Sequence, residues 1–286
     1  MGMGTSTRII DTTAKVAAAE WNALQLDGNP FLRHEFLLSL EQQRCVNRDT
    51  GWRVQHLVLE DRGGHLQAAM PLYQKTHSWG EFVFDWSWAR AYSQAGLSYY
   101  PKLVSMAPFT PVPGRRCLTL PGANGEAMRR TLAQALIEHA RSKAHSSAHV
   151  LFVLEEDRLA LQEQGFLLRK DCQFHWHNRD YRSFEAFIAT FRAEKRKKAL
   201  RERRRITEAG VRFATLHGDE ISEELWAIVF AFSAGTFAAH GHEHYLNVDF
   251  FRAVAQALLN SVMVKLAYIG DDRPIAAAIF FRSADT

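Results

Sequence analysis

The sequence predicts a mixed α/β chain built from two copies of one unit, the second shorter than the first. Helical apolar spacing alternates with short strand-like runs, and one strand–turn–strand pattern occurs twice. With 286 residues, 47% of them hydrophobic, the chain can form two cores, because domains usually hold about 100–200 residues. A repeat therefore decides the expected architecture.

The first unit is expected to begin with helices and a β-hairpin. Apolar residues recur at helical spacing in residues 12–26 and again in 30–43, PFLRHEFLLSLEQQ. Two strand-like runs follow, VQHLVLE and HLQAAMPLY, and the glycines of DRGG between them suit a tight turn. The expected order is therefore helix, helix, hairpin.

The C-terminal region repeats this order. The first hairpin matches, without a gap at an offset of 209, the run VKLAYIGDDRPIAAAIFF, so that Leu57 falls on Leu266. The helix before the first hairpin, FLRHEFLLSLEQQ, matches YLNVDFFRAVAQALL at an offset of 214, with Phe36 on Phe250. Chance similarity of two amphipathic hairpins is the alternative interpretation. The second copy ends soon after its hairpin, so the expectation is a C-terminally truncated unit.

The segment between the two hairpins predicts further helices and strands. A helix is expected over about 125–143, then a buried strand HVLFVLE, a short helix DRLALQEQG and an alternating strand CQFHWHN. From Ser183 to Gly210 the sequence predicts one long helix, with Ser183 as its N-cap and Gly210 just past its end. The expected boundaries are 1–181 for the first domain, 182–210 for a basic connecting helix and 211–286 for the second domain.

Positive charge is concentrated in that connecting helix. The chain carries a net charge of +4, but residues 192–205 alone carry a net +7, which leaves the rest of the chain at −3. Such a local excess indicates either an anionic partner or a strongly solvated helix. Both interpretations remain open at this point.

Composition excludes several classes. Three widely spaced cysteines form no CxxC pair and no disulfide framework, and no run approaches the about 18 apolar residues of a membrane span or a signal peptide. A cytoplasmic location without a membrane span is expected. The nucleophile elbow and the P-loop are absent, so serine hydrolase and NTPase functions lack their defining residues.

Four strings carry a resemblance to a known family: NPFLRHEFL, PLYQKTHSWGEFVFDWSWARAY, YYPKLVSMAPFTPVPG and RRRITEAGV. They resemble the FemAB-like predicted N-acyltransferases, described as peptidoglycan biosynthesis/recognition proteins. The resemblance implies two tandem GNAT-like (acyl-CoA N-acyltransferase-like) units, the second incomplete. It also implies acyl or aminoacyl transfer to a primary amine, on a small-molecule amine or a cell-wall precursor.

The resemblance leaves two co-substrates open, acyl-CoA and aminoacyl-tRNA, and implies no bound cofactor. A standard GNAT unit holds the CoA pyrophosphate with a glycine-rich turn, and none follows HLQAAMPLY, where the chain reads QKTHSWGEF. Fem enzymes use aminoacyl-tRNA, and a basic helix can neutralise its phosphates. The candidate donor-binding residues are Lys195, Arg196, Lys198, Arg201 and Arg204.

The aromatic string supplies the candidate catalytic residues. His77, Glu81 and Asp85 are spaced by four, so they would share one face of a helix, and the two acids would still share a face in a strand. They are candidates for the base and its orienting groups. The alternative is that the acids only accept hydrogen bonds from indole N–H groups. The candidate substrate-binding residues are Trp79, Trp86, Trp88, Tyr100 and Lys102.

Lys102 has a second interpretation, as a lysine whose stem lies along the surface. The histidine pairs and triplets HWH (175–177) and HGHEH (240–244) have period-two spacing that could place ligands together, but no motif supports a metal, and none is expected. The rival to the enzyme is a non-catalytic scaffold that binds cell-wall precursors or RNA, since fold alone does not establish chemistry.

Overall fold

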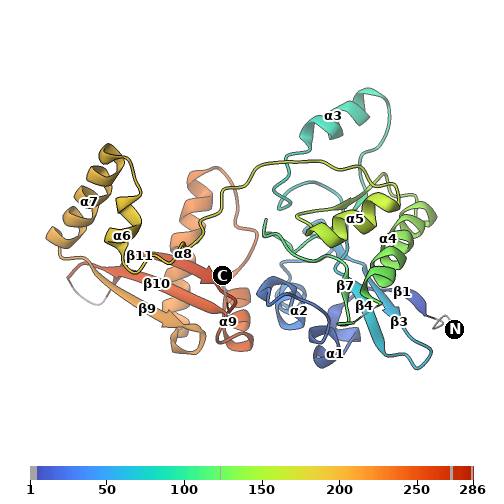
Figure 1. Ribbon diagram of the computed structural model, residues 1–286, viewed down its shortest axis with the longest axis horizontal. Coiled ribbons are helices and arrows are strands. Elements are labelled where there is room, and N and C mark those ends of the chain that lie inside the picture. The colour runs from blue at the N-terminus through green and yellow to red at the C-terminus, as the bar shows by residue number, and fades with distance from the viewer. Residues whose placement is uncertain (1–4, 123, 271–272, 285) are drawn as a thin grey trace.

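The computed structural model describes residues 5–122, 124–270, 273–284 and 286, and it shows a mixed α/β protein (Figure 1). The strands are β1 (Ser6–Ile10), β2 (Trp52–Val54), β3 (His56–Glu60), β4 (Leu66–Met70), β5 (Tyr73–Lys75), β6 (Lys102–Ser105), β7 (Leu118–Thr119), β8 (Ala148–Val150), β9 (Arg212–His217), β10 (Val262–Tyr268) and β11 (Pro274–Phe281). The helices are α1 (Ala18–Asn22), α2 (His34–Gln42), α3 (Trp86–Gln94), α4 (Gly125–Ser142), α5 (Glu155–Glu163), α6 (Phe184–Ala189), α7 (Ala193–Glu208), α8 (Glu223–Ala239) and α9 (Val248–Ala257), with short 3-10 turns η1 (Thr13–Lys15), η2 (Pro30–Leu32) and η3 (Gly218–Glu220).

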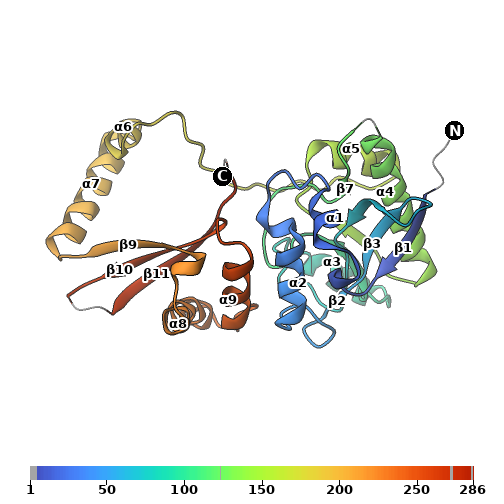
Figure 2. The ribbon, with the colours of Figure 1, turned by 90° about the horizontal axis from the view of Figure 1, so that it is seen from below.

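These strands form three small sheets. Two sheets lie in the N-terminal half, in the orders β1-β3-β4-β7 and β2-β5-β6-β8, and one lies in the C-terminal half, in the order β11-β10-β9. All neighbours are antiparallel except β6 and β8, which are parallel. Figure 2 shows α8 and α9 on one side of the C-terminal sheet and the α6–α7 pair on the other.

The same order of elements occurs in both halves. Apart from η2 and β2, which have no counterpart among the described residues, the series β1-η1-α1-α2-β3-β4 matches β9-η3-α8-α9-β10-β11, and the middle strand pairs antiparallel with both others each time. Both expected hairpins are confirmed, although Asp271 and Asp272 of the second turn lie outside the described residues. The GNAT-like character of the two units stays a prediction.

Strand pairing corrects the alignment of the repeat. Val58 pairs with Ala69 and Leu266 pairs with Ala277, so one offset of 208 matches both strands. The register irregularity after Leu59 also falls on the one after Ala267 at this offset. The ungapped offset of 209 was wrong by one residue. Both faces of the first hairpin are apolar, so its sequence does not distinguish a register shifted by one residue.

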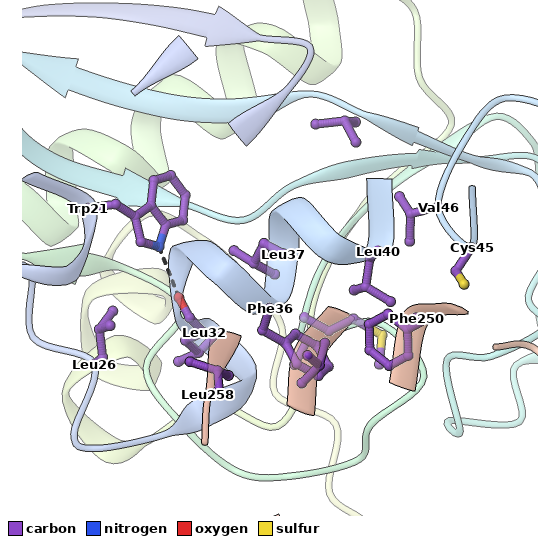
Figure 3. Close-up of a cluster of buried hydrophobic side chains, with 14 of the residues drawn as sticks. Trp21, Leu26, Leu32, Phe36, Leu37, Leu40, Cys45, Val46, Phe250 and Leu258 are labelled. Carbon is purple, nitrogen blue, oxygen red and sulfur yellow. Dashed lines mark hydrogen bonds between the residues drawn. The ribbon is translucent and has the colours of Figure 1, made fainter. Parts of the chain in front are cut away.

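Equivalent helices of the two halves pack against each other. The ring of Phe36 on α2 meets the ring of Phe250 on α9 edge to face, with 5.4 Å between centroids (Figure 3). Asn247, the N-cap of α9, donates a hydrogen bond of 2.8 Å to the carbonyl of Gln43 at the end of α2. α2 and α9 are equivalent helices in the sequence repeat, so the two halves meet through equivalent surfaces.

The two middle strands differ in burial. In β3 both faces are covered, since Leu57 packs with Leu132 and Leu136 of α4 while Val58 faces the helices on the other side. In β10 only one face is covered: Leu266 is buried, whereas Lys265 is exposed. Apolar burial in the second unit is therefore one-sided.

The long helix expected from Ser183 to Gly210 is wrong, because the chain breaks between α6 and α7. Its two ends are confirmed: the Ser183 side chain accepts from the amide of Ala186, and Gly210 has a φ of +69°. At the break, the hydroxyl of Thr190 bonds the carbonyl of Phe187, a local bond that competes with helix continuation. α7 then runs on with no buried residue.

Two of the expected strands differ from prediction. CQFHWHN forms no strand, and Phe174 is 99% exposed, because alternation alone supplies no neighbouring strand for pairing. HVLFVLE contributes β8 at its first two residues and an isolated parallel bridge between Val153 and Gly114. The helix over 125–143 is confirmed as α4.

Candidate functional site

The aromatic loop, residues 76–85 between β5 and α3, has no regular structure. Its catalytic candidates therefore do not share a helix or strand face, and that expectation was wrong. Phe82 and Phe84 have φ values of +59° and +47°, and Gly80 has +81°. A Cβ on Gly80 would come within 2.7 Å of the Phe109 ring, so this position needs glycine. Packing against Phe109 and these positive φ values give the loop a bent path, although the spacing of its residues is that of an amphipathic helix.

The loop encloses a buried ion cluster of Glu81, Asp85 and Lys102. The Lys102 ammonium on β6 lies 2.7 Å from Glu81 and 2.5 Å from Asp85, and all three side chains are at most 2% exposed. The surface interpretation of Lys102 is thus wrong. The structure brings together two of the three predicted catalytic residues with one predicted substrate-binding residue.

Hydrogen bonds complete this cluster. Tyr99 Oη donates to Asp85 at 2.7 Å, and Lys102 Nζ donates to Ser78 Oγ at 2.9 Å. Burial opposes ionisation of Asp85, but the bonds from Lys102 and Tyr99 lower its pKa to about 2. Burial raises the pKa of Glu81 despite the nearby ammonium. The Asp85 carboxylate is therefore the firmly charged partner of Lys102.

Lys75, a residue that sequence reasoning missed, lies beside this cluster. It pairs across strands with Lys102, is fully buried, and places its Nζ 3.5 Å from the centroid of the Trp52 ring. The Nζ donates to the carbonyl of Trp79 at 3.0 Å. Burial lowers the pKa of Lys75 to about 6, so its amine is neutral at pH 7. The only sign of Lys75 in the sequence is that it lies two residues after Tyr73, which puts both side chains on the same face of a strand.

Replacing Lys75 by Met should stabilise the protein at pH 7, by an amount on the order of a few kcal/mol, and this gain should shrink by about 1.4 kcal/mol for each pH unit towards pH 10. Because the folded-state pKa is lowered to about 6 from 10.5, the unfolded chain binds one more proton between these pH values, and wild-type stability rises with pH across that window. Urea unfolding at pH 7 and pH 10 measures this. The exposed Lys143→Met is the control, and equal midpoints for wild type and Lys75→Met would contradict a neutral lysine.

A cavity of about 490 Å³ opens next to the cluster, where the aromatic loop meets α8 and the segment after it. Its lining, called here the aromatic cavity, consists of Ser78, Trp79, Gly80, Phe82, Phe84, Trp86, Thr236, Phe237, His240, His242 and Tyr245. No Asp, Glu, Lys or Arg belongs to this lining. Both halves of the molecule supply its walls, and Ser78 connects it to Lys102.

The cavity brings histidines to the predicted aromatic residues. The His242 ring lies 5.2 Å from that of Trp79, which lies 5.0 Å from that of Trp86. Sequence reasoning considered HGHEH only as a metal motif, and no group of three or more potential metal ligands occurs among the described residues. The spacing of these histidines could not predict their contact with Trp79, because Trp79 lies in the other half of the chain.

The remaining candidates lie elsewhere. His77 Nε2 bonds the carbonyl of Thr50 at 3.0 Å and its Nδ1 accepts from the amide of Trp79, so His77 fixes the aromatic loop. Trp88 on α3 is 58% exposed and is not part of the lining. Tyr100 lies behind the lining, with its hydroxyl 2.8 Å from Ser78 Oγ.

The basic helix α7 lies at the end of the molecule away from the N-terminal half (Figure 1). Within the described part of the chain, its recorded ion pair joins Lys198 to Glu202 at 3.7 Å. Arg203 stacks over the Phe184 ring at 4.2 Å. Arg196 is half-buried and donates to the carbonyl of Ala189, whereas Lys195, Lys198, Arg201 and Arg204 are exposed.

A family model described as peptidoglycan biosynthesis/recognition, FemAB-like, matches residues 12–286. The chain belongs to the FemAB-like family. This assigns the protein to a family of peptidoglycan-related transferases and confirms the resemblance read from the aromatic strings. No curated protein matches this FemAB-like chain. None of the helices in its described residues is long and apolar enough to cross a membrane.

Proposed function

We propose that this FemAB-like protein transfers an acyl or aminoacyl group to a primary amine of a cell-wall precursor or other small molecule, in the aromatic cavity. The observation that carries the proposal is the pair His240 and His242 in the wall of an otherwise uncharged cavity between the two halves. A histidine is the commonest general base in enzymes.

The proposed step is direct. The amine nitrogen bonds to the acyl carbonyl carbon, His242 takes the proton from that nitrogen, and the bond from the carbonyl carbon to the donor breaks. The leaving oxygen or sulfur of the donor then receives the proton. The hydroxyl of Ser78 in the lining can donate to the carbonyl oxygen as charge develops on it, since Ser78 Oγ accepts from Lys102 and either hydroxyl can be the donor in its bond with Tyr100.

The buried ion cluster holds the site in shape under this proposal. Glu81 and Asp85 belong to the aromatic loop or its end, and Lys102 anchors both to β6. Neither carboxylate lines the cavity, so they act as positioning residues rather than as the base. His77 supports the same loop through Thr50.

Helix α7 is proposed to contact an anionic donor, acyl-CoA or aminoacyl-tRNA. Its exposed cations favour phosphate binding, whose strength falls steeply with salt. Changing Lys195, Arg196, Lys198, Arg201 and Arg204 to Gln should weaken donor binding and flatten its salt dependence. Unchanged binding would remove α7 from donor recognition.

The test of the function is amide formation, followed by mass spectrometry, with a primary amine and either donor. His242→Gln should lower kcat about 100-fold or more, because it removes the base without altering the fold. His65→Gln, at the exposed first hairpin turn, is the matched control and should keep the full rate. Ligand binding without any transfer by the wild type would favour the non-catalytic scaffold instead.

A further inference from the structure

We propose that the aromatic cavity holds a bulky apolar acyl group of an activated ester or thioester donor, in preference to an acetyl or aminoacyl group. This inference rests on the proposed acyl transfer and adds the chemical class of the group transferred. Three features support it, namely the size of the cavity, the chemistry of its lining and the position of its few polar atoms.

Size is the first argument. A cavity of about 490 Å³ lies within the range of about 300–1,000 Å³ that encloses drug-sized ligands. An acetyl or glycyl group would fill only a small part of it. Water left in such an apolar space gains few hydrogen bonds, so a ligand that displaces it is favoured.

The lining is the second argument. Six aromatic side chains form most of the wall, namely Trp79, Phe82, Phe84, Trp86, Phe237 and Tyr245. Four of these rings, Trp79, Phe82, Phe84 and Trp86, are 40–73% exposed, so the wall is an open aromatic surface. It offers the ammonium of an aminoacyl group no carboxylate partner. Apolar carbon, by contrast, gains about 25 cal/mol for each Å² that it removes from water.

The polar atoms are placed for a reacting carbonyl. Ser78 comes from the aromatic loop, and Thr236, His240 and His242 come from α8 and its C-terminal end, so polar groups from both halves meet at one cavity. The acyl chain can lie among the rings while its carbonyl meets these groups. The amine then bonds to the carbonyl carbon and the ester or thioester bond breaks, as in the proposed step.

A second cavity gives a contrast within the molecule. It has about 480 Å³ beside β8, and its lining includes Arg158, Arg169, Lys170 and Asp171. Charged side chains of this kind suit a polar or ionic ligand. The uncharged lining of the aromatic cavity is thus a property of that site and not of cavities in this protein generally.

The experiment is a calorimetric titration of the full chain with thioesters of N-acetylcysteamine. These carry acetyl, butanoyl, hexanoyl or octanoyl groups. Each added methylene should tighten Kd up to about fourfold until the cavity is filled, as expected for burial of a CH₂ group. A Kd independent of chain length, or a glycyl thioester that binds more tightly than the octanoyl one, would overturn the inference.

Thr236→Phe tests the location. Thr236 is exposed on α8, and its hydroxyl bonds the carbonyl of Phe232, so a larger ring can enter the cavity without disturbing the core. Octanoyl binding should fall at least tenfold while acetyl binding stays constant. The control is Thr207→Phe, an exposed threonine with the same type of bond to Arg203 on α7. An equal loss of octanoyl binding in both variants would mean that the acyl group binds outside the aromatic cavity.

These outcomes separate the two proposals. Chain-length-dependent binding that Thr236→Phe abolishes, without any amide product, would support the acyl site and contradict the proposed transfer. Amide formation at equal efficiency from acetyl and octanoyl thioesters would support the transfer and contradict the acyl site.

Discussion

Replacing Lys102 by Met should destabilise the protein by about 3–5 kcal/mol, because the carboxylates of Glu81 and Asp85 would stay buried without their cation. Each of the two acids already has one oxygen without a hydrogen-bond partner in the described residues. Tyr99 would remain as a donor to Asp85, but Glu81 would lose the hydrogen bond that Lys102 donates to it. Urea unfolding at pH 7 gives the loss. Since the aromatic loop depends on this cluster, hexanoyl thioester binding should fall as well.

A triple variant separates support from chemistry. Lys102→Met combined with Glu81→Gln and Asp85→Asn removes all three charges, and most of the lost stability should return because no unpaired charge remains buried. If this stable variant still forms amides, the cluster only positions the loop. If it is stable and binds thioester but forms no product, a member of the cluster takes part in the chemistry. A Lys102→Met variant as stable as the wild type would contradict the buried ion cluster itself.

Phe250→Ala should cost about 3–5 kcal/mol and weaken the contact between the halves, because Phe250 is fully buried against Phe36. Thermal and urea unfolding measure the cost. A double-mutant cycle with Phe36→Ala should give a coupling of about 0.5–1.5 kcal/mol, as for aromatic pairs in contact. Octanoyl binding should fall too, since both halves line the cavity.

Phe174→Ala is the matched control for this change. Phe174 is 99% exposed in the segment that joins the two halves, so its truncation should alter stability by less than about 0.5 kcal/mol. If Phe250→Ala were as mild as Phe174→Ala, the α2–α9 contact would not be what holds the halves together.

Local patterns predicted the elements whose partners are near in sequence. The hairpin around Gly63 and Gly64 and the helix α4 follow from turn chemistry and apolar spacing alone. CQFHWHN failed because a strand needs a neighbour, and its alternation contains no information about one. The break before α7 was not predicted, because the run consists mostly of good helix formers and the local hydrogen bond of Thr190 has no clear signal in the sequence.

The site was predictable in composition but not in assembly. Aromatic residues in 79–86 stood out by their density, and Trp79 and Trp86 do line the cavity. Lys75 did not stand out and His242 did so only within a possible metal motif, because their contacts are with β6 and with the opposite half. Lys102 was assigned to both surface and site, and only its burial between two carboxylates decides between them.

The contact between α2 and α9 joins equivalent surfaces, which is the geometry of an isologous dimer. Here the two partners share one chain, so each meets the other at an effective concentration that the connecting segment sets, typically in the millimolar range for short linkers. Dilution cannot separate them. The aromatic cavity, whose walls come from both halves, therefore assembles within one molecule and independently of protein concentration, with the aromatic loop supplied by the first half alone.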